Sequence, residues 1–254
     1  MLRSSDRVRN AEFQHPVNDH GEVTGYSDRA FLWSRGQMME LGTMGRASSW
    51  GTAINERGEV TGHSWTAPLA DFHAFLWSHG QMIDLGALGG TLSAGYAINN
   101  RGEVTGIAEI EPGTFFYHAF LWSRGEMIDL GTLGGRTSFG FAINNRSEVT
   151  GFADLESGSI HAFFWSRGEM IDLGTLSGTS ASFGRAINDR GEVTGYTVGG
   201  GDRAWLWSGG QMTDLGSLGG TSSQGMAIND HGQVTGYSDG ANGVGPHAFL
   251  ACRR

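Results

Sequence analysis

The residues best suited to chemistry stand at one recurring position, directly before the sequence Ala-Ile-Asn or its variant Pro-Val-Asn. That position differs in every copy and holds His15, Thr52, Tyr96, Phe141, Arg185 and Met226. An arginine side chain binds a carboxylate or phosphate through two parallel hydrogen bonds, or stacks on an aromatic ring. An imidazole changes its charge near neutral pH and can carry a proton. We therefore expect Arg185 to anchor a polar or anionic group, and His15 is a candidate proton carrier.

A second variable position lies two residues earlier and is mostly aromatic. It holds Phe13, Trp50, Ala94, Phe139, Phe183 and Gln224. Small-molecule sites are usually concave, lined by aromatic side chains and provided with a few polar groups. We therefore predict a ligand site around Arg185 that is lined by Phe13, Trp50, Tyr96, Phe139, Phe141, Phe183 and Met226. The alternative is that these aromatic side chains only fill the contacts between structural elements.

Two segments that differ between copies, residues 63–72 and 107–117, add acidic candidates. Asp71, Glu109 and Glu111 stand there beside the aromatic residues Trp65, Phe115, Phe116 and Tyr117, which would extend the ligand wall. A carboxylate near an aromatic wall can have a raised pKa and act as a general acid or base. If the chain is an enzyme, we expect its catalytic residues among His15, Asp71, Glu109 and Glu111. Exposed acidic loop residues more often only favour solubility, and the sequence contains no standard catalytic motif.

The recurring histidines suggest a metal site, but their spacing argues against one. His73, His118, His161 and His247 occupy the same place in their copies, with Arg29 and Arg203 in two others. Metal ligands must lie about 2 Å from one ion, which residues on separate copies cannot easily do. We predict structural hydrogen bonds for these histidines, and a solvated or turn-capping role for Glu40, Asp84, Asp129, Asp172 and Asp214. No metal and no cofactor is expected.

The chain is built from six copies of one repeat. The triplet Val-Thr-Gly begins at Val23, Val60, Val104, Val149, Val193 and Val234, a period of about 37–45 residues. Each copy has four short apolar runs bounded by turn residues, in the fifth copy at residues 184–188, 192–196, 203–207 and 211–215. Four antiparallel strands per repeat make one propeller blade. We predict an all-β protein, a six-bladed β-propeller forming a single domain over residues 1–254.

The two ends of the chain suggest how the ring closes. The last copy stops after HAFLACRR and lacks its fourth strand, while residues 7–13 (RVRNAEF) precede the first copy. We predict that residues 7–13 complete the last blade, which would protect its edge. The Ala-Ile-Asn strands are predicted to be innermost, with constant turns at the lower end of the ring and the variable positions around the upper mouth. The tryptophans Trp33, Trp77, Trp122, Trp165 and Trp207 are predicted to be core residues.

One whole copy resembles a known repeat. The segment HAFLWSRGEMIDLGTLGGRTSFGFAINNRSEVTG, residues 118–151, is similar to the HAF repeat of bacterial repeat proteins, many of which are regarded as extracellular. The resemblance extends over nearly the whole chain. It implies a repeat scaffold and no particular substrate, because the family is defined by its sequence pattern.

Composition limits the classes of partner. The formal net charge is −9, with 17 basic residues among 254. This argues against nucleic acid and against anionic membranes, which need clustered basic residues. No apolar run is long enough to span a membrane, and the single cysteine, Cys252, excludes an internal disulfide. The start of the chain lacks a secretory signal, which predicts a cytoplasmic protein, or an extracellular one if a signal has been removed.

Three hypotheses for function follow. The first is a binding protein with one central aromatic pocket for a small molecule, anchored by Arg185, and acting as a monomer or weak homo-oligomer. The second is an enzyme of bacterial secondary metabolism that uses the same pocket for cofactor-free cyclisation, isomerisation or lyase chemistry. The third is a lectin-like or protein-interaction scaffold, which predicts the same functional residues in several copies. Because the candidate residues differ between copies, we favour the first.

Overall fold

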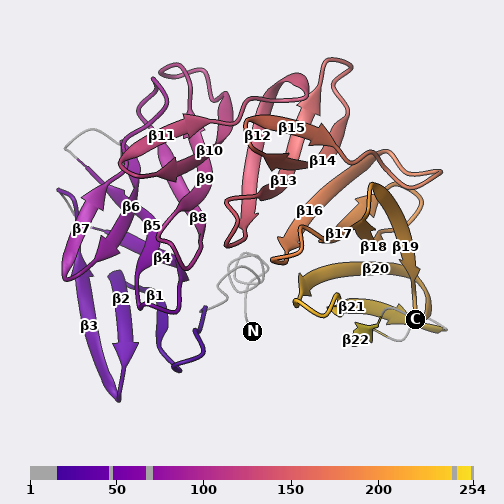
Figure 1. Cartoon of the computed structure of the whole chain (residues 1–254), viewed down its shortest axis with the longest axis horizontal. Coiled ribbons are helices and arrows are strands. Elements are labelled where there is room, and N and C mark those ends of the chain that lie inside the picture. The colour runs from indigo at the N-terminus through magenta and orange to yellow at the C-terminus, as the bar shows by residue number, and fades with distance from the viewer. Residues whose placement is uncertain (1–15, 46–47, 67–70, 242–244, 253–254) are drawn as a thin grey trace, which may run out of the picture.

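The computed structural model describes residues 16–45, 48–66, 71–241 and 245–252, and these ranges consist of β-strands joined by short turns (Figure 1). The strands form six antiparallel groups, which are called sheets here and numbered in chain order. One parallel pair, Ile160 with Ala181, joins the fourth and fifth of them into a continuous eight-stranded sheet. Within each sheet, strands that follow one another in the chain are paired. Among the described residues there is no helix with the length and hydropathy to cross a membrane.

The sheets contain three or four strands each. The first sheet has β1 (Val23–Ser27), β2 (Arg29–Ser34) and β3 (Gln37–Gly42). The second has β4 (Ser49–Ile54), β5 (Val60–Trp65), β6 (Phe72–Ser78) and β7 (Gln81–Asp84). The third has β8 (Ser93–Ile98), β9 (Val104–Glu109), β10 (Tyr117–Ser123) and β11 (Glu126–Asp129).

The remaining three sheets repeat this order. The fourth has β12 (Gly134–Ile143), β13 (Val149–Leu155), β14 (Ile160–Ser166) and β15 (Glu169–Asp172). The fifth has β16 (Ala181–Ile187), β17 (Val193–Val198), β18 (Arg203–Ser208) and β19 (Gln211–Gly216). The sixth has β20 (Gly219–Ile228), β21 (Val234–Gly240) and β22 (Pro246–Ala251). The four strands predicted for the fifth copy are therefore confirmed, with ends shifted by at most three residues.

The sheets stand around a common axis, with β4, β8, β12, β16 and β20 innermost (Figure 1). Each of these strands contacts the next one around the axis. Their ends surround one cavity of about 360 Å³, which is lined by Ile-Asn pairs such as Ile54–Asn55 and Ile98–Asn99. The prediction that the Ala-Ile-Asn strands are innermost is therefore confirmed.

The predicted closed ring is not shown by the described residues. Within them β22 pairs only with β21, and no strand pairing joins the sixth sheet to the first. In Figure 1 the six sheets form an arc that runs from the indigo first sheet to the yellow sixth sheet. The segment predicted to close the ring, residues 7–13, lies outside the described residues.

The lower ends of the sheets are joined by asparagine side chains. The Nδ2 atoms of Asn18, Asn55, Asn99, Asn144 and Asn188 each donate a hydrogen bond of 2.9–3.0 Å to the backbone oxygen of the corresponding asparagine in the next sheet. The Oδ1 atom of each accepts backbone N–H groups of its own turn, as Asn55 does from Arg57 and Glu59. Each asparagine thus holds its own turn in place and links that turn to the next sheet, which explains why this part of the repeat is constant.

Glycine is required where two sheets come closest. Gly51, Gly95, Gly140, Gly184 and Gly225 each face the threonine hydroxyl of the preceding sheet, and a Cβ atom there would collide with the threonine Oγ1. The threonine cannot withdraw, since its hydroxyl is buried and donates to a backbone oxygen, as Thr61 does to Phe75 at 2.8 Å. Part of the high glycine content is therefore explained by close approach of backbone between sheets.

Apolar cores lie between neighbouring sheets. In one of them Val60, Phe75 and Trp77 of the second sheet pack against Leu32 and Leu41 of the first. The predicted burial of the repeated tryptophans is confirmed at Trp77 and Trp165 but is wrong for Trp33, whose side chain is 39% exposed. The reason is its place in the first sheet, because each tryptophan packs against the sheet that precedes it.

Candidate functional site

The variable residue before Ala-Ile-Asn occupies a β-bulge in five sheets. The pairing register skips one residue between Gly51 and Ala53, and likewise around Tyr96, Phe141, Arg185 and Met226. A bulge adds one residue to a strand without a partner opposite it, and it changes the direction of that side chain. The pairing of the strand with its neighbour can therefore stay the same while the bulged residue differs from sheet to sheet.

The other variable position pairs across the sheet with a residue that the sequence analysis missed. Trp50 stands opposite His63, Phe139 opposite Phe152, and Phe183 opposite Tyr196. The rings of each pair are stacked, with centroids 4.9, 4.7 and 5.2 Å apart. The missed residues directly follow Val-Thr-Gly. That position holds Tyr26, His63, Ile107, Phe152, Tyr196 and Tyr237, a variation that could have identified it.

Six rings from the third, fourth and fifth sheets form one group, the large aromatic cluster. Its members are Tyr96, Phe139, Phe141, Phe152, Phe183 and Tyr196. The Tyr96 ring lies 6.0 Å from Phe141, and Phe152 lies 5.2 Å from Phe183, edge to face. Tyr117 adjoins the cluster, 6.3 Å from Phe139. The structure thus brings together five of the predicted aromatic residues.

Arg185 packs against this cluster. Its guanidinium carbon lies 5.2 Å from the centre of the Phe141 ring and 5.7 Å from that of Tyr196, within the range of a cation–π interaction. The Nε atom is buried without a hydrogen-bond partner, and the side chain forms no ion pair with another described residue. A buried donor without a partner is unfavourable, so Arg185 retains hydrogen-bonding capacity for an external acceptor.

A smaller aromatic cluster joins the first and second sheets. It consists of Tyr26, Trp50, His63, Trp65 and Phe72. Tyr26 and Trp50 are stacked at 4.7 Å, and the His63 ring lies between Trp50 and Phe72. Burial lowers the pKa of His63 to about 4, and its Nδ1 atom has no hydrogen-bond partner. The His63 imidazole is therefore neutral at physiological pH.

The other predicted ligand residues are dispersed. Met226 is the bulged residue of β20. The Phe115 side chain is 70% exposed, and the ring of Phe116 lies 5.1 Å from the Arg136 guanidinium carbon. Phe13 and His15 lie outside the described residues, so the predicted roles of both stay predictions.

The three acidic candidates occupy different surroundings. Glu109 ends β9 and is fully buried, whereas a solvent-exposed position was expected. Its carboxylate accepts hydrogen bonds from the backbone N–H groups of Thr91 at 3.0 Å and Gly113 at 2.9 Å, which holds two loops together. Glu111 is exposed, and Asp71 is half-buried. Their catalytic role stays a prediction.

The structural role predicted for the repeated histidines is confirmed for His73, His118 and His161, while that of His247 stays a prediction. The Nδ1 atoms of His73, His118 and His161 lie 2.8–2.9 Å from Asp84, Asp129 and Asp172 of the outermost strand in the same sheet. Each of these aspartates also accepts the N–H of a glycine two residues later, which caps the turn as predicted. Arg203 and Asp214 form the corresponding ion pair at 3.1 Å. In the described part of the chain no group of three or more His, Cys, Asp and Glu side chains could hold a metal ion.

Several solved structures share this architecture at low sequence identity. The β-propeller domain of the Trilobed protease from Pyrococcus furiosus, described as having an open velcro topology, superposes with a TM-score of 0.61 and 12% identity, over 93% of this chain and 78% of that one. An acylaminoacyl peptidase from Pyrococcus horikoshii gives a TM-score of 0.60 at 11% identity, over 94% of this chain and 43% of that one.

A putative TolB from Agrobacterium tumefaciens superposes with a TM-score of 0.57 at 10% sequence identity, over 94% of this chain and 89% of that one. The chain folds as a β-propeller. No family model and no curated protein matches the sequence. The comparisons therefore support a propeller, and the likeness to the HAF repeat rests on the sequence motif alone.

Proposed function

We propose that this propeller binds a small molecule beside the large aromatic cluster, with Arg185 anchoring its polar or anionic end. The observation that carries the proposal is the half-buried Arg185 side chain, whose guanidinium lies within cation–π distance of two aromatic rings while its Nε lacks a hydrogen-bond partner. Two rings fix the position of the cation before a ligand arrives, so little conformational entropy is lost on binding. A carboxylate or phosphate would supply both the charge and the acceptors that Arg185 lacks.

The aromatic residues favour a ligand with an apolar or aromatic body. Rings from three neighbouring sheets form a continuous wall next to Arg185. Aromatic side chains present a large and rigid contact area, which suits recognition of a ring or an unsaturated chain. The bulge position supports the same proposal, because it makes Arg185 unique among the copies without disturbing the scaffold.

The first test is a screen of small carboxylates and phosphates by native mass spectrometry and thermal shift. Wild type, Arg185→Ala and Arg167→Ala are compared, since Arg167 is an exposed residue of the turn between β14 and β15 and belongs to neither aromatic cluster. A ligand at ~100 times its dissociation constant should stabilise wild type and Arg167→Ala by about 2.7 kcal/mol. Arg185→Ala should gain almost nothing. Equal stabilisation of all three proteins would contradict the proposal.

The enzyme hypothesis is tested with the ligand that this screen identifies. Prolonged incubation with wild type, followed by mass analysis of the ligand, distinguishes retention from conversion to an isomer or elimination product. Unchanged ligand supports a binding protein. If the ligand is converted, then Glu109→Gln tests whether the buried carboxylate carries the proton.

A further inference from the structure

Two equivalent clefts lie at the lower end of the propeller, each between neighbouring sheets. The cleft between the second and third sheets has a volume of about 300 Å³, and the cleft between the first and second sheets about 370 Å³. Corresponding positions of the repeat line both clefts. These are Leu76, Glu59, Arg101, Gly102, Glu103, Trp122, Ser123 and Arg124 in one, and Leu32, Glu22, Arg57, Gly58, Glu59, Trp77, Ser78 and His79 in the other.

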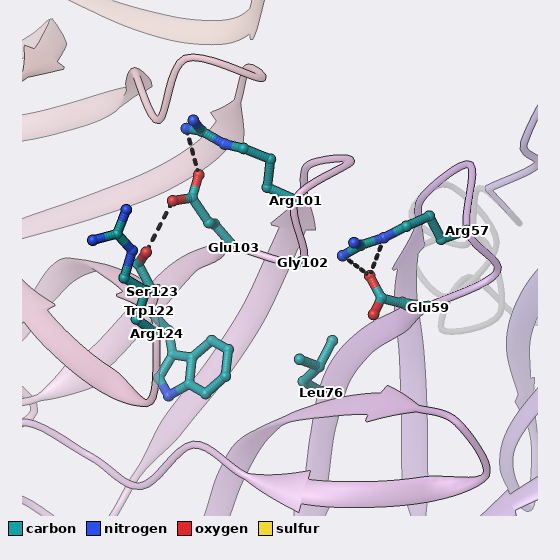
Figure 2. A pocket seen from close by; sticks show the side chains of 9 residues that line it. All are labelled: Arg57, Glu59, Leu76, Arg101, Gly102, Glu103, Trp122, Ser123 and Arg124. Carbon is teal, nitrogen blue, oxygen red and sulfur yellow. Dashed lines mark hydrogen bonds and ion pairs between the residues drawn. The ribbon is translucent and has the colours of Figure 1, made fainter.

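Each cleft has an apolar side and a polar side. Figure 2 shows the Trp122 indole and the Leu76 side chain on one side of the cleft, across from the Arg57–Glu59 and Arg101–Glu103 ion pairs. The ion pairs close at 2.6 and 2.9 Å, yet the Arg57 and Arg101 side chains remain 53% and 51% exposed. Donor groups of both arginines are therefore open to solvent beside an aromatic surface.

The polar side is rigid. The Glu103 carboxylate accepts hydrogen bonds from Asn99 at 2.6 Å and from Ser123 at 2.9 Å, and Glu59 is held in the same way by Asn55 and Ser78. Burial raises the pKa of Glu103, but its side-chain hydrogen bonds outweigh this effect and lower the pKa overall. Each carboxylate is thus ionised and fixed in place, and it lacks the freedom that a solvated surface residue has.

Two other interfaces between neighbouring sheets have the same arginine–glutamate pair and tryptophan, but a larger side chain occupies one position of the cleft. Between the third and fourth sheets, Ser147 stands where Gly58 and Gly102 stand in the clefts, and its hydroxyl donates to Glu103 at 2.8 Å. Between the fourth and fifth sheets, Phe164 replaces the leucine and stacks on Trp207 at 5.4 Å. The ion pair and tryptophan are therefore a structural unit of the repeat. A small glycine and an aliphatic leucine are what distinguish the two clefts.

We propose that each cleft binds one sugar ring of a glycan. The C–H face of a sugar packs on the apolar side of the cleft, while its hydroxyl groups accept hydrogen bonds from the exposed arginine N–H groups. The linings carry little net charge, with three arginines and two glutamates in one cleft and one arginine and two glutamates in the other, which suits a neutral polyhydroxylated ring better than a multiply charged anion. Two sites on one rigid ring would also bind a surface that displays many glycans more tightly than a single sugar.

The test uses isothermal titration with a panel of methyl glycosides of neutral hexoses, 6-deoxyhexoses and N-acetylhexosamines. Inorganic phosphate and sulfate serve as anion probes. We expect wild type to bind at least one glycoside at two sites per chain. Gly102→Ser should leave one site, because its hydroxyl would occupy Arg57 and Glu59 as Ser147 occupies Glu103. The turn accepts serine, since Ser147 has a positive φ of 61° at that position.

A second pair of variants keeps the test independent of that glycine. Arg124→Ala removes an exposed guanidinium from the cleft, and we expect about tenfold weaker binding at that site. Arg167→Ala is the matched control, because Arg167 has the same turn position and the same φ of 54° in the fourth sheet. The proposal is wrong if no glycoside binds at millimolar concentration, if only phosphate and sulfate bind, or if Gly102→Ser and Arg124→Ala both bind as wild type does.

Discussion

At the scale of single residues, His63 shows how the surroundings set the chemistry of a side chain. A histidine exposed to water titrates near pH 6.5. Here the ring is stacked on Trp50 and tilted against Phe72, and burial lowers its pKa to about 4. Between these two values the unfolded chain binds a proton that the folded chain does not. His63 therefore makes the fold less stable as the pH falls.

We predict that His63→Phe removes this dependence. From pH 7.5 to pH 5, wild type should lose about 2 kcal/mol of unfolding free energy through His63, and His63→Phe should lose almost none of it. The interval stays above the usual pKa of glutamate, so the buried glutamates contribute little to the change. Urea denaturation at both pH values measures the effect. His231→Gln, a change at an exposed histidine, should behave like wild type. Equal pH dependence in all three proteins would show that His63 is solvated.

At the scale of elements, the innermost strand contains a glycine that contacts the preceding sheet and, next to it, a bulged residue whose type varies. Gly95 meets the Thr61 hydroxyl and the Gly62 backbone of the preceding sheet, and the next residue, Tyr96, is the bulge. The glycine allows neighbouring sheets to approach closely, while the bulge orients a side chain that packing leaves free to vary. This division explains why one residue of the strand is glycine in five copies, while its neighbour is different in each copy.

We predict that Gly95→Ala destabilises the propeller by about 1–3 kcal/mol, as overpacking of a close interface does. The added methyl group would displace the Thr61 hydroxyl from its hydrogen bond to the Phe75 oxygen. Gly245→Ala is the control, because no atom lies within 4 Å of its added Cβ. Chemical denaturation of the three proteins measures the difference. A stability change no larger than that of Gly245→Ala would mean that the two sheets are not in close contact at Gly95.

At the scale of the whole molecule, the sixth sheet differs from the others in what covers it. Leu250 is 60% exposed, whereas the corresponding Leu76 and Leu121 are 5% and 4% exposed. Each of those leucines is covered by the sheet that follows it in the chain. The face of the sixth sheet that holds Leu250 has no such neighbour among the described residues.

We therefore predict that Leu250→Ala and Leu76→Ala have very different effects. Leu76→Ala leaves a cavity between two sheets and should cost about 2–5 kcal/mol. Leu250→Ala removes exposed surface and should cost less than ~0.5 kcal/mol. Thermal and urea unfolding at two protein concentrations measures both. A large cost at Leu250 would mean that another segment, or a second chain, covers this face, and a dependence on concentration would identify the second chain.

The sequence by itself determined the repeat, the four strands of the second to fifth copies, the innermost strand and the structural pairing of His73, His118 and His161. These features follow the repeat, and local turn chemistry is sufficient to specify them. The sequence also singled out Arg185, since its difference from the other copies is visible without a structure.

Only the tertiary structure decided which side chains meet. The bulge, the pairing of Phe183 with Tyr196 and the burial of Glu109 depend on register between strands and on contact between sheets. The two lower clefts were not predicted either, because they depend on a glycine and a leucine whose neighbours belong to another copy. Such contacts join residues that are far apart in the chain, and their geometry is set by packing, which a repeat pattern does not encode.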